Sequence, residues 1–284
     1  MLPVAIGPRT FAGPGPFVMG VLNVTPDSFS DGGRHAGVER ALAWAERLRA
    51  DGADLLDVGG ESTRPGAPAV SAQEEIDRVV PVVERLARGG YPLPISVDTW
   101  KAEVARAALA AGAHLVNDIQ GLADPAMARA VAEAGAPVVA MHMRGTPADM
   151  QSRAVYGDVV TEVRAELEAV LARALAAGIP RERVILDPGL GFAKTAAHNL
   201  LLLRELPRLR IEGCALLVGP SRKSFIGHVT GAPVEARLPG TLAAVAAAVL
   251  AGAELVRVHD VAEARQAAQV AAAIRDASQS PDAR

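Results

Sequence analysis

Residues 95–118 read ISVDTWKAEVARAALAAGAHLVND, which predicts a strand, a helix and a second strand in one continuous stretch. The two outer runs are short, apolar and β-branched, as in buried parallel strands. Between them, Lys101–Ala110 has helical composition, and Gly112 follows it as a stop. Each run ends on a polar residue, Asp98 in the first and Asn117 in the second. This unit predicts a parallel sheet with polar groups at the carboxyl ends of its strands.

Similar units recur along the whole chain. The expected strands are Val18–Leu22, Leu55–Val58, Pro94–Val97, Leu115–Asn117, Pro137–Met141, Val184–Leu186, Leu216–Gly219 and Leu255–Val258. The expected helices are Val38–Arg49, Glu74–Ala87, Lys101–Ala110, Pro125–Ala134, Val159–Ala177, Leu200–Leu206, Leu242–Ala251 and Val261–Ile274. Eight such units over about 250 residues predict an α/β fold, a (β/α)8 TIM barrel. A doubly wound open sheet alternates in the same way, but no dinucleotide-type glycine fingerprint opens the first unit.

The chain has 284 residues, half of them hydrophobic, so it can bury a large core, and a single domain over residues 1–284 is expected. Residues 1–17 are rich in proline and glycine and are expected to form a short cap over the other end of the barrel. Residues 277–284 are polar and are expected to fray.

The composition argues against several classes of protein. The formal charge of -3 gives no general attraction to nucleic acid or to anionic lipid. No signal peptide is evident, and the longest apolar stretch, Thr241–Ala253, is shorter than the roughly 18–20 residues that span a bilayer. A lone cysteine, Cys214, cannot form an internal disulfide, which fits a reducing compartment. A cytoplasmic protein is expected, with no nucleic-acid or membrane partner.

Three loops that follow predicted strands are long and polar. They read NVTPDSFSDGG at 23–33, GGESTRPGAPAVS at 59–71 and DPGLGFAKT at 187–195. Glycine and proline at this density let backbone approach a ligand and limit the entropy lost on ordering. Three such loops on one rim indicate a binding site there, whereas one alone is equally well explained as a surface turn.

Five side chains at the expected barrel mouth suit a phosphate or pyrophosphate. They are Asn23, Thr63, Arg64, Arg257 and His259. Arginine binds phosphate through a fixed fork of donors, and its charge persists at any working pH. Mg²⁺ is expected to bridge the pyrophosphate, with few protein ligands of its own.

Asp98, Asn117 and Asp187 are expected to point into the barrel mouth, where buried polar groups need partners. An aminopyrimidinone ring would satisfy them, with Asp187 accepting two hydrogen bonds and Lys223 donating to the ring carbonyl. A metal site and a carboxylate pair for acid–base chemistry are the alternatives. The metal site is the weaker one, because His259 is the only histidine clearly among these residues.

The segment GPSRKSF at 219–225 is expected to open a short helix and to bind an anion through backbone N–H groups. It is not a Walker A loop, so nucleotide hydrolysis is not supported. Phe29 and Phe192 lie in two of the long loops, where they could flank a flat substrate or serve as hydrophobic anchors.

Eight segments of the chain occur in the order found in the dihydropteroate synthases of folate biosynthesis. They are NVTPDSFSDGG, DVGGESTRPGA, SVDT, NDI, MHMRG, DPGLGFAKT, GPSRKSF and RVHDV. The chain resembles that family from about Val18 to Val261. The resemblance implies a transferase that joins 6-hydroxymethyl-7,8-dihydropterin pyrophosphate to 4-aminobenzoate, giving 7,8-dihydropteroate and pyrophosphate by an SN1-like route.

The resemblance also implies roles for individual residues. The pterin pocket would comprise Asp98, Asn117, Met141, Asp187 and Lys223. The pyrophosphate site would comprise Asn23, Thr63, Arg64, Arg257 and His259, with Mg²⁺ at Asn23. The aminobenzoate site would comprise Phe29, Pro65, Phe192, Lys223 and Ser224. The catalytic groups would be Lys223, Asp98, Arg257 and His259. Members of the family are commonly homodimers and sulfonamide targets.

Other functions fit parts of this pattern. The pterin-binding domain of corrinoid methyltransferases shares the Asp and Asn contacts, but it has no need for the STRPG and SRKS anion groups. A catalytically silent pterin carrier would not need Lys223, Arg64 and Arg257. A phosphate-sugar isomerase on the same fold would need a strand-end Lys/Glu pair, and none stands out.

Overall fold

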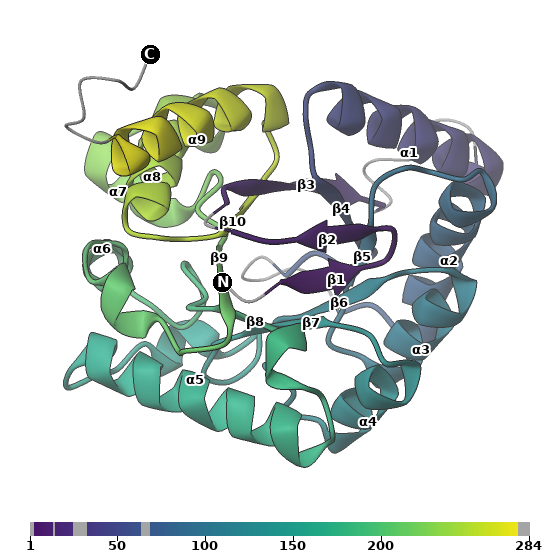
Figure 1. Ribbon diagram of the computed structural model, residues 1–284, viewed down its shortest axis with the longest axis horizontal. Helices are drawn as coiled ribbons and strands as arrows, with labels where there is room; N and C mark the ends of the chain where they lie inside the picture. The colour runs from purple at the N-terminus through teal and green to yellow at the C-terminus, as the bar shows by residue number, and fades with distance from the viewer. Residues whose placement is uncertain (1–2, 14, 25–32, 64–68, 278–284) are drawn as a thin grey trace.

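The structure is a computed structural model that describes residues 3–13, 15–24, 33–63 and 69–277. Its centre is a closed barrel of parallel strands (Figure 1). The barrel strands are β3 (Phe17–Asn23), β4 (Leu55–Gly59), β5 (Ile95–Asp98), β6 (Leu115–Asp118), β7 (Val138–Met141), β8 (Val184–Asp187), β9 (Ala215–Val218) and β10 (Leu255–Val258). Strand β10 pairs with both β9 and β3, so the sheet closes on itself. The predicted (β/α)8 barrel is confirmed, and the open sheet is excluded.

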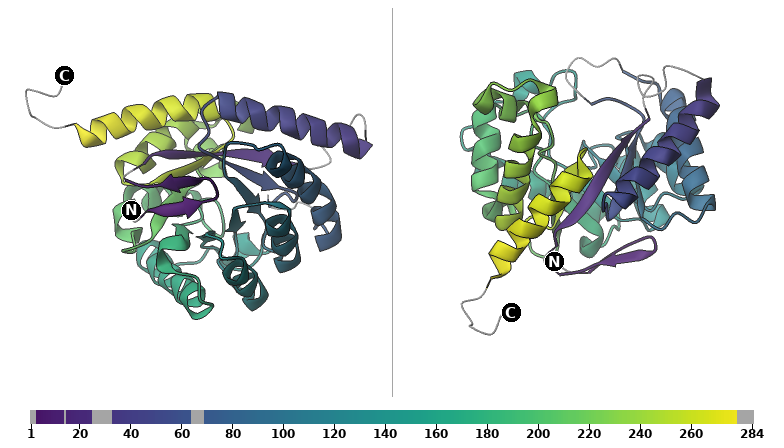
Figure 2. Two further views of the ribbon diagram at one scale, coloured as in Figure 1. Left: turned by 45° about the vertical axis from the view of Figure 1, so that its right-hand side comes forward. Right: turned by 90° about the horizontal axis from the view of Figure 1, so that it is seen from above.

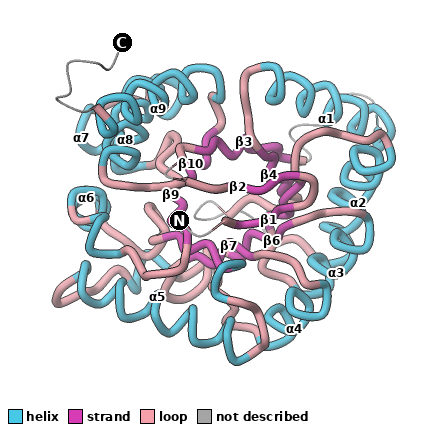
Figure 3. The backbone as a smooth tube through the Cα atoms, in the orientation of Figure 1, coloured by secondary structure: helices cyan, strands magenta, loops and turns pink. Residues whose placement is uncertain are grey.

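Helices form an outer layer, which Figure 3 shows as a ring around the strands. They are α1 (Gly33–Ala50), α2 (Ala72–Arg88), α3 (Ala102–Ala111), α4 (Pro125–Ala134), α5 (Val159–Ala176), α6 (Ala196–Arg204), α7 (Ser224–Thr230), α8 (Leu238–Leu250) and α9 (Val261–Asp276). Short 3₁₀ helices lie at Met150–Arg153, Arg181–Arg183, Leu206–Leu209 and Val234–Ala236. The short helix expected after the seventh strand is α7.

Three helices begin at least four residues earlier than predicted, α1 at Gly33, α6 at Ala196 and α8 at Leu238. Near the start of α8, the sequence Pro239–Gly240 is typical of a turn, so the helix was expected to begin after it. Proline is nevertheless tolerated in the first turn of a helix, because its missing N–H would have no partner there.

An antiparallel hairpin of β1 (Val4–Ile6) and β2 (Arg9–Phe11) covers one end of the barrel (Figure 2). Its apolar side chains pack with barrel-interior residues such as Met19. The rings of Phe11 and Phe17 meet edge to face, with centroids 4.9 Å apart. This end of the barrel is therefore filled with apolar groups, which leaves chemistry to the opposite end.

A larger apolar core lies between the barrel strands and the surrounding helices. Because the strands are covered on both faces, a fully buried polar residue within them, such as Asp57 in β4, is notable. Within the described ranges, no helix is both long and apolar enough to cross a membrane. The fraying predicted for residues 277–284 falls outside the described residues, apart from Ala277.

Candidate active site

Polar side chains meet at the carboxyl end of the barrel because the parallel strands are in register there. Strands β3 and β4 pair Asn23 with Gly59. Strands β4 and β5 pair Gly59 with Asp98, and β5 and β6 pair Asp98 with Asn117. The structure thus brings these predicted residues to one rim.

Arg257 lies between two carboxylates of this rim. Its Nε donates to Asp57 Oδ2 at 2.6 Å, and its Nη2 donates to Asp98 Oδ2 at 2.6 Å. Asn117 Nδ2 also donates to Asp57 Oδ2, at 2.8 Å. Burial raises the pKa of Asp98, and the Arg257 guanidinium opposes that rise. Arg257, expected only among pyrophosphate and catalytic groups, therefore also contacts the predicted pterin residues.

Asp57 was not among the predicted site residues. It is fully buried, and its Oδ1 has no hydrogen-bond partner among the described residues. A signal was present in the sequence, because Asp57 interrupts the apolar run Leu55–Val58. A carboxylate inside a buried strand needs a cationic or donor partner.

Asp187 and Lys223 form the other side of the predicted pterin pocket. Asp187 is buried, and its Oδ1 accepts from the Gly189 N–H at 2.7 Å. Burial raises the pKa of Asp187 and lowers that of Lys223 to about 8, while the attraction between the two charges opposes both shifts. Met141, opposite Asp187 in the β7–β8 register, is also buried. Lys223 Nζ lies 4.0 Å from the centroid of the Phe192 ring.

His259 is held by Ser221, which lies in the segment 219–225 predicted to bind an anion but was not itself named as a site residue. Ser221 Oγ accepts from the backbone N–H of His259 at 3.2 Å and lies 2.9 Å from His259 Nδ1. Since the hydroxyl accepts from the backbone, its own proton can go to Nδ1. The Nε2 of the neutral ring then carries the proton and can donate to an anion.

A cavity of about 610 Å³ opens between α1 and α9 and reaches Asn23 and His259. Arg222 lines it as well, in a bidentate ion pair with Asp260, the Nε to Oδ2 distance being 3.0 Å. Two predicted anion-binding residues thus share one cavity with further polar groups.

The remaining predicted residues divide into two groups. Thr63 and Ser224 are described, Thr63 beyond the end of β4 and Ser224 as the first residue of α7. The other three, Phe29, Arg64 and Pro65, lie outside the described residues.

The model of the pterin binding enzyme family matches residues 19–259. A dihydropteroate synthase of Escherichia coli is 47% identical over 264 residues, 93% of each chain. One of Synechocystis is 46% identical, over 96% of this chain and 95% of the relative.

Solved structures give the same result. A Yersinia pestis dihydropteroate synthase in a sulfonamide drug complex has a TM-score of 0.91 and 46% identity, and the match covers 97% of this chain and 100% of that one. A Xanthomonas albilineans dihydropteroate synthase with 4-aminobenzoic acid has a TM-score of 0.90 and 49% identity, covering 97% and 99%.

The closed barrel and its polar rim, with the match over residues 19–259, define a pterin-binding enzyme. Within this class, the relatives and solved structures that match the chain are dihydropteroate synthases. The chain belongs to the dihydropteroate synthase family, whose reaction is a step of folate biosynthesis.

Proposed function

We propose that the chain condenses 6-hydroxymethyl-7,8-dihydropterin pyrophosphate with 4-aminobenzoate, giving 7,8-dihydropteroate and pyrophosphate. The observation that carries this proposal is the meeting of Asp98, Asn117 and Asp187 at one rim of the barrel, with the partly buried Lys223 attracted electrostatically to Asp187. Xanthomonas albilineans relatives bind 4-aminobenzoic acid and 7,8-dihydropteroate, which supports the proposed substrate and product.

The pterin pocket supplies complementary donors and acceptors. Asp187 would accept two hydrogen bonds from the aminopyrimidinone edge, and Lys223 would donate to the ring carbonyl. Asn117 is oriented by Asp57, whose carboxylate accepts a hydrogen bond from the Asn117 side-chain amide. Met141 would pack beneath the flat ring.

Pyrophosphate would be held by Asn23, Thr63, Arg64, Arg257 and His259. In the first step the C–O bond to the exocyclic methylene breaks, and pyrophosphate leaves with the electron pair. Positive groups placed around the leaving oxygens stabilise the charge that develops there. Electron donation within the ring, and the Asp98 carboxylate, would stabilise the pterin cation.

In the second step the amine nitrogen of 4-aminobenzoate attacks the methylene carbon, and the arylammonium then loses a proton to solvent. A neutral arylamine is already nucleophilic, so no strong general base is needed. The aminobenzoate ring would lie against the Phe192 and Lys223 side chains, near Ser224, with Phe29 and Pro65 as further contacts from outside the described residues.

Asn23 fits Mg²⁺ as one of few protein ligands. It ends β3 with an exposed side chain and can offer an amide oxygen. Among the described residues, no group of three or more His, Cys, Asp and Glu could hold a metal ion. A single amide oxygen from the protein suits a hard cation that is held mainly by substrate phosphates. Bound there, Mg²⁺ would neutralise charge on the leaving group.

Calorimetry should show pyrophosphate binding that needs Mg²⁺ and weakens in Asn23→Ala. Equal binding of pyrophosphate without Mg²⁺ would contradict this role.

Closure of the first two loops over pyrophosphate is proposed to order the aminobenzoate site. The basis is the glycine- and proline-rich sequence of residues 23–33 and 59–71. Aminobenzoate should therefore bind more tightly when pyrophosphate and Mg²⁺ are present, as measured by calorimetry. Equal affinity with and without them would rule out this order.

We also propose a cytoplasmic homodimer. The cysteine at 214 is buried and unpaired, which fits a reducing compartment. The α8–α9 face is a candidate dimer surface, because Leu250, Val270 and Ile274 are 46%, 61% and 61% exposed. Light scattering should give twice the monomer mass, and Val270→Asp should lower it. A wild-type monomer would contradict the proposal.

The reaction itself is tested by mixing the protein with Mg²⁺, the pterin pyrophosphate and 4-aminobenzoate. Pyrophosphate release that requires both substrates, with an equal amount of dihydropteroate, is the expected result. Pterin binding without release would instead favour a silent carrier or the methyltransferase relative.

A further inference from the structure

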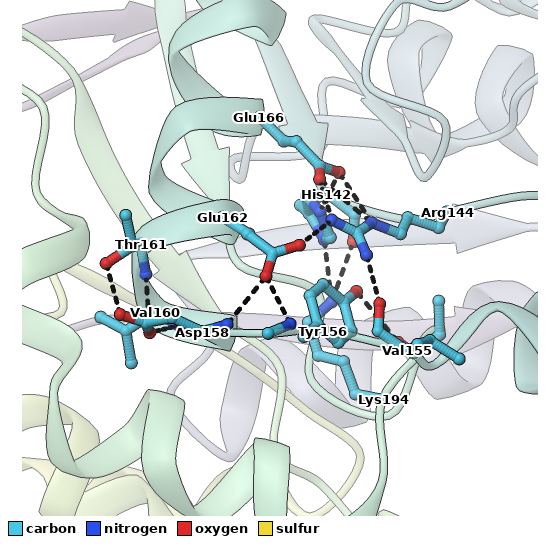
Figure 4. Close-up of polar contacts among 12 residues, drawn as sticks. His142, Arg144, Val155, Tyr156, Asp158, Val160, Thr161, Glu162, Glu166 and Lys194 are labelled. Atoms are coloured by element: carbon cyan, nitrogen blue, oxygen red, sulfur yellow. Dashed lines mark hydrogen bonds and ion pairs between the residues drawn. The ribbon is translucent and has the colours of Figure 1, made fainter.

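A polar network with His142 and Lys194 buried at its centre lies between the loops after β7 and β8 and helix α5 (Figure 4). Its members are His142, Arg144, Tyr156, Glu162, Glu166 and Lys194. None of them is a predicted site residue. The two glutamates come from α5, whereas Lys194 comes from the loop after β8, so the network ties that loop to an outer helix.

Lys194 is the centre of this network. Its side chain is buried, and its Nζ lies 2.9 Å from Phe192 O, 2.9 Å from His142 Nδ1 and 3.4 Å from His142 O. His142 Nε2 contacts Glu166 at 2.8 Å, so Nε2 carries the ring proton and Nδ1 accepts. Burial and the nearby Lys194 lower the pKa of His142 to about 4, which keeps the ring neutral. In its protonated form the amino group of Lys194 thus has one acceptor for each of its three protons.

Tyr156 holds the next carbonyl of the same loop. Its hydroxyl donates to Ala193 O at 3.0 Å. Its ring packs against Arg144, whose guanidinium carbon lies 4.0 Å from the ring centroid. Arg144 in turn binds Glu162 at 2.8 Å and Glu166 at 3.0 Å on α5. Two consecutive loop carbonyls are therefore each held by a side chain anchored in this network.

The loop needs such anchors because its backbone is strained. Ala193 has φ of 48°, in the left-handed region that is unfavourable for any L-residue with a Cβ. A conformation of this kind persists where the surroundings over-determine it, and such residues cluster at functional sites. The residue just before Ala193 is Phe192, whose ring lies against Lys223.

We propose that Lys194 and Tyr156 are positioning residues for the aminobenzoate half of the site. They hold the carbonyls of residues 192 and 193 and so keep the Phe192 ring beside Lys223. This inference rests on the proposed function, in which Phe192 and Lys223 together line the aminobenzoate site.

Steady-state kinetics of the full-length enzyme test the proposal. Tyr156→Phe and Lys194→Met should each raise KM for 4-aminobenzoate on the order of tenfold, equal to about 1.4 kcal/mol. KM for the pterin pyrophosphate should stay within about twofold, because Asp98, Asn117 and Asp187 lie within strands, whereas the lost bonds hold residues 192 and 193 of the loop. If Lys194→Met does not fold, Tyr156→Phe decides the question.

Tyr91→Phe is the matched control. Tyr91 also donates its hydroxyl to a backbone carbonyl, Ala45 O at 2.6 Å, but that bond is remote from the loop. It should leave both KM values unchanged. Equal rises in both KM values, or no rise for 4-aminobenzoate in Tyr156→Phe, would overturn the proposal.

Hydrogen exchange of the substrate-free protein measures how firmly the loop after β8 is held, and it does not depend on activity. The Phe192 amide bonds to Gly189 O at 3.1 Å, and it should exchange on the order of tenfold faster in Tyr156→Phe but not in Tyr91→Phe. Unchanged exchange would overturn the positioning role even if the wild type were inactive. Failure of the proposed function would show separately, as absence of pyrophosphate release by the wild type.

Discussion

Buried charged side chains organise the rim of this barrel. Asp57 accepts from both Arg257 and Asn117, so one carboxylate orients a predicted pyrophosphate residue and a predicted pterin residue. Asp98 and Asp187 could be predicted because each ends an apolar run. Asp57 could not be assigned a partner, because Arg257 lies 200 residues away along the chain.

Asp187→Asn should weaken pterin binding by about 1–3 kcal/mol, because a charged hydrogen-bond acceptor is lost at constant shape. Titration calorimetry with the pterin substrate, without 4-aminobenzoate, measures this. Asp54→Asn is the control, since Asp54 precedes β4 at the opposite end of the barrel and binds Val18 N and Arg265. Unchanged pterin affinity in Asp187→Asn would remove Asp187 from the pocket.

The stability of the protein should depend on pH through Lys194. Burial lowers its pKa from 10.5 to about 7, so between these values the unfolded chain binds more protons than the folded one. The free energy of unfolding contributed by this group therefore rises with pH in that window. Urea unfolding at pH 7 and pH 9 should show wild type gaining on the order of 1–2 kcal/mol relative to Lys194→Met. The same difference in the free energy of unfolding between the two proteins at pH 7 and pH 9 would refute this.

At the scale of elements, the loop after β8 depends on close backbone contact. Gly189 has φ of 67°, and a Cβ there would lie 2.0 Å from His142 O. Gly178 has φ of 89° but open space around its missing Cβ. The two glycines share the left-handed conformation and differ in steric surroundings.

Gly189→Ala should therefore cost more than the roughly 1–2 kcal/mol of left-handed strain expected for Gly178→Ala. It should also lower kcat/KM, because the loop must shift away from His142, whereas Gly178→Ala should keep the wild-type value. Thermal unfolding and steady-state kinetics of both variants check this. Equal losses in the two would show that the contact with His142 O is unimportant.

At the scale of the whole molecule, the barrel separates stability from chemistry. The hairpin of β1 and β2 fills the end opposite the polar rim with apolar side chains. The residues of the hairpin therefore contribute to the stability of the fold and not to substrate binding. Barrels of this kind carry catalysis at the carboxyl ends of their strands.

Phe11→Ala should destabilise the fold by about 3–5 kcal/mol, since the ring is 3% exposed and packs on Phe17. At temperatures well below unfolding, kcat/KM should equal that of the wild type. Denaturant unfolding and kinetics on the same preparation measure both. A large loss of kcat/KM in folded Phe11→Ala would mean that the two ends are coupled.

The eight barrel strands, the helices between them and the polar residues at the ends of several strands could be predicted from the sequence alone, whereas the hairpin of β1 and β2 was expected only as a cap. They depend on local spacing, as Asp98 after Ile95–Val97 and Asn117 after Leu115–Val116 show. Closure of the barrel and the pairing of its charges were decided only by the tertiary structure. Arg257 meets Asp98 across 159 residues, and Lys194 meets His142 across 52. The contact of Arg257 exists only once the last strand has paired with the first, and that of Lys194 only once β7 has paired with β8. No local spacing encodes which distant side chain will satisfy a buried charge.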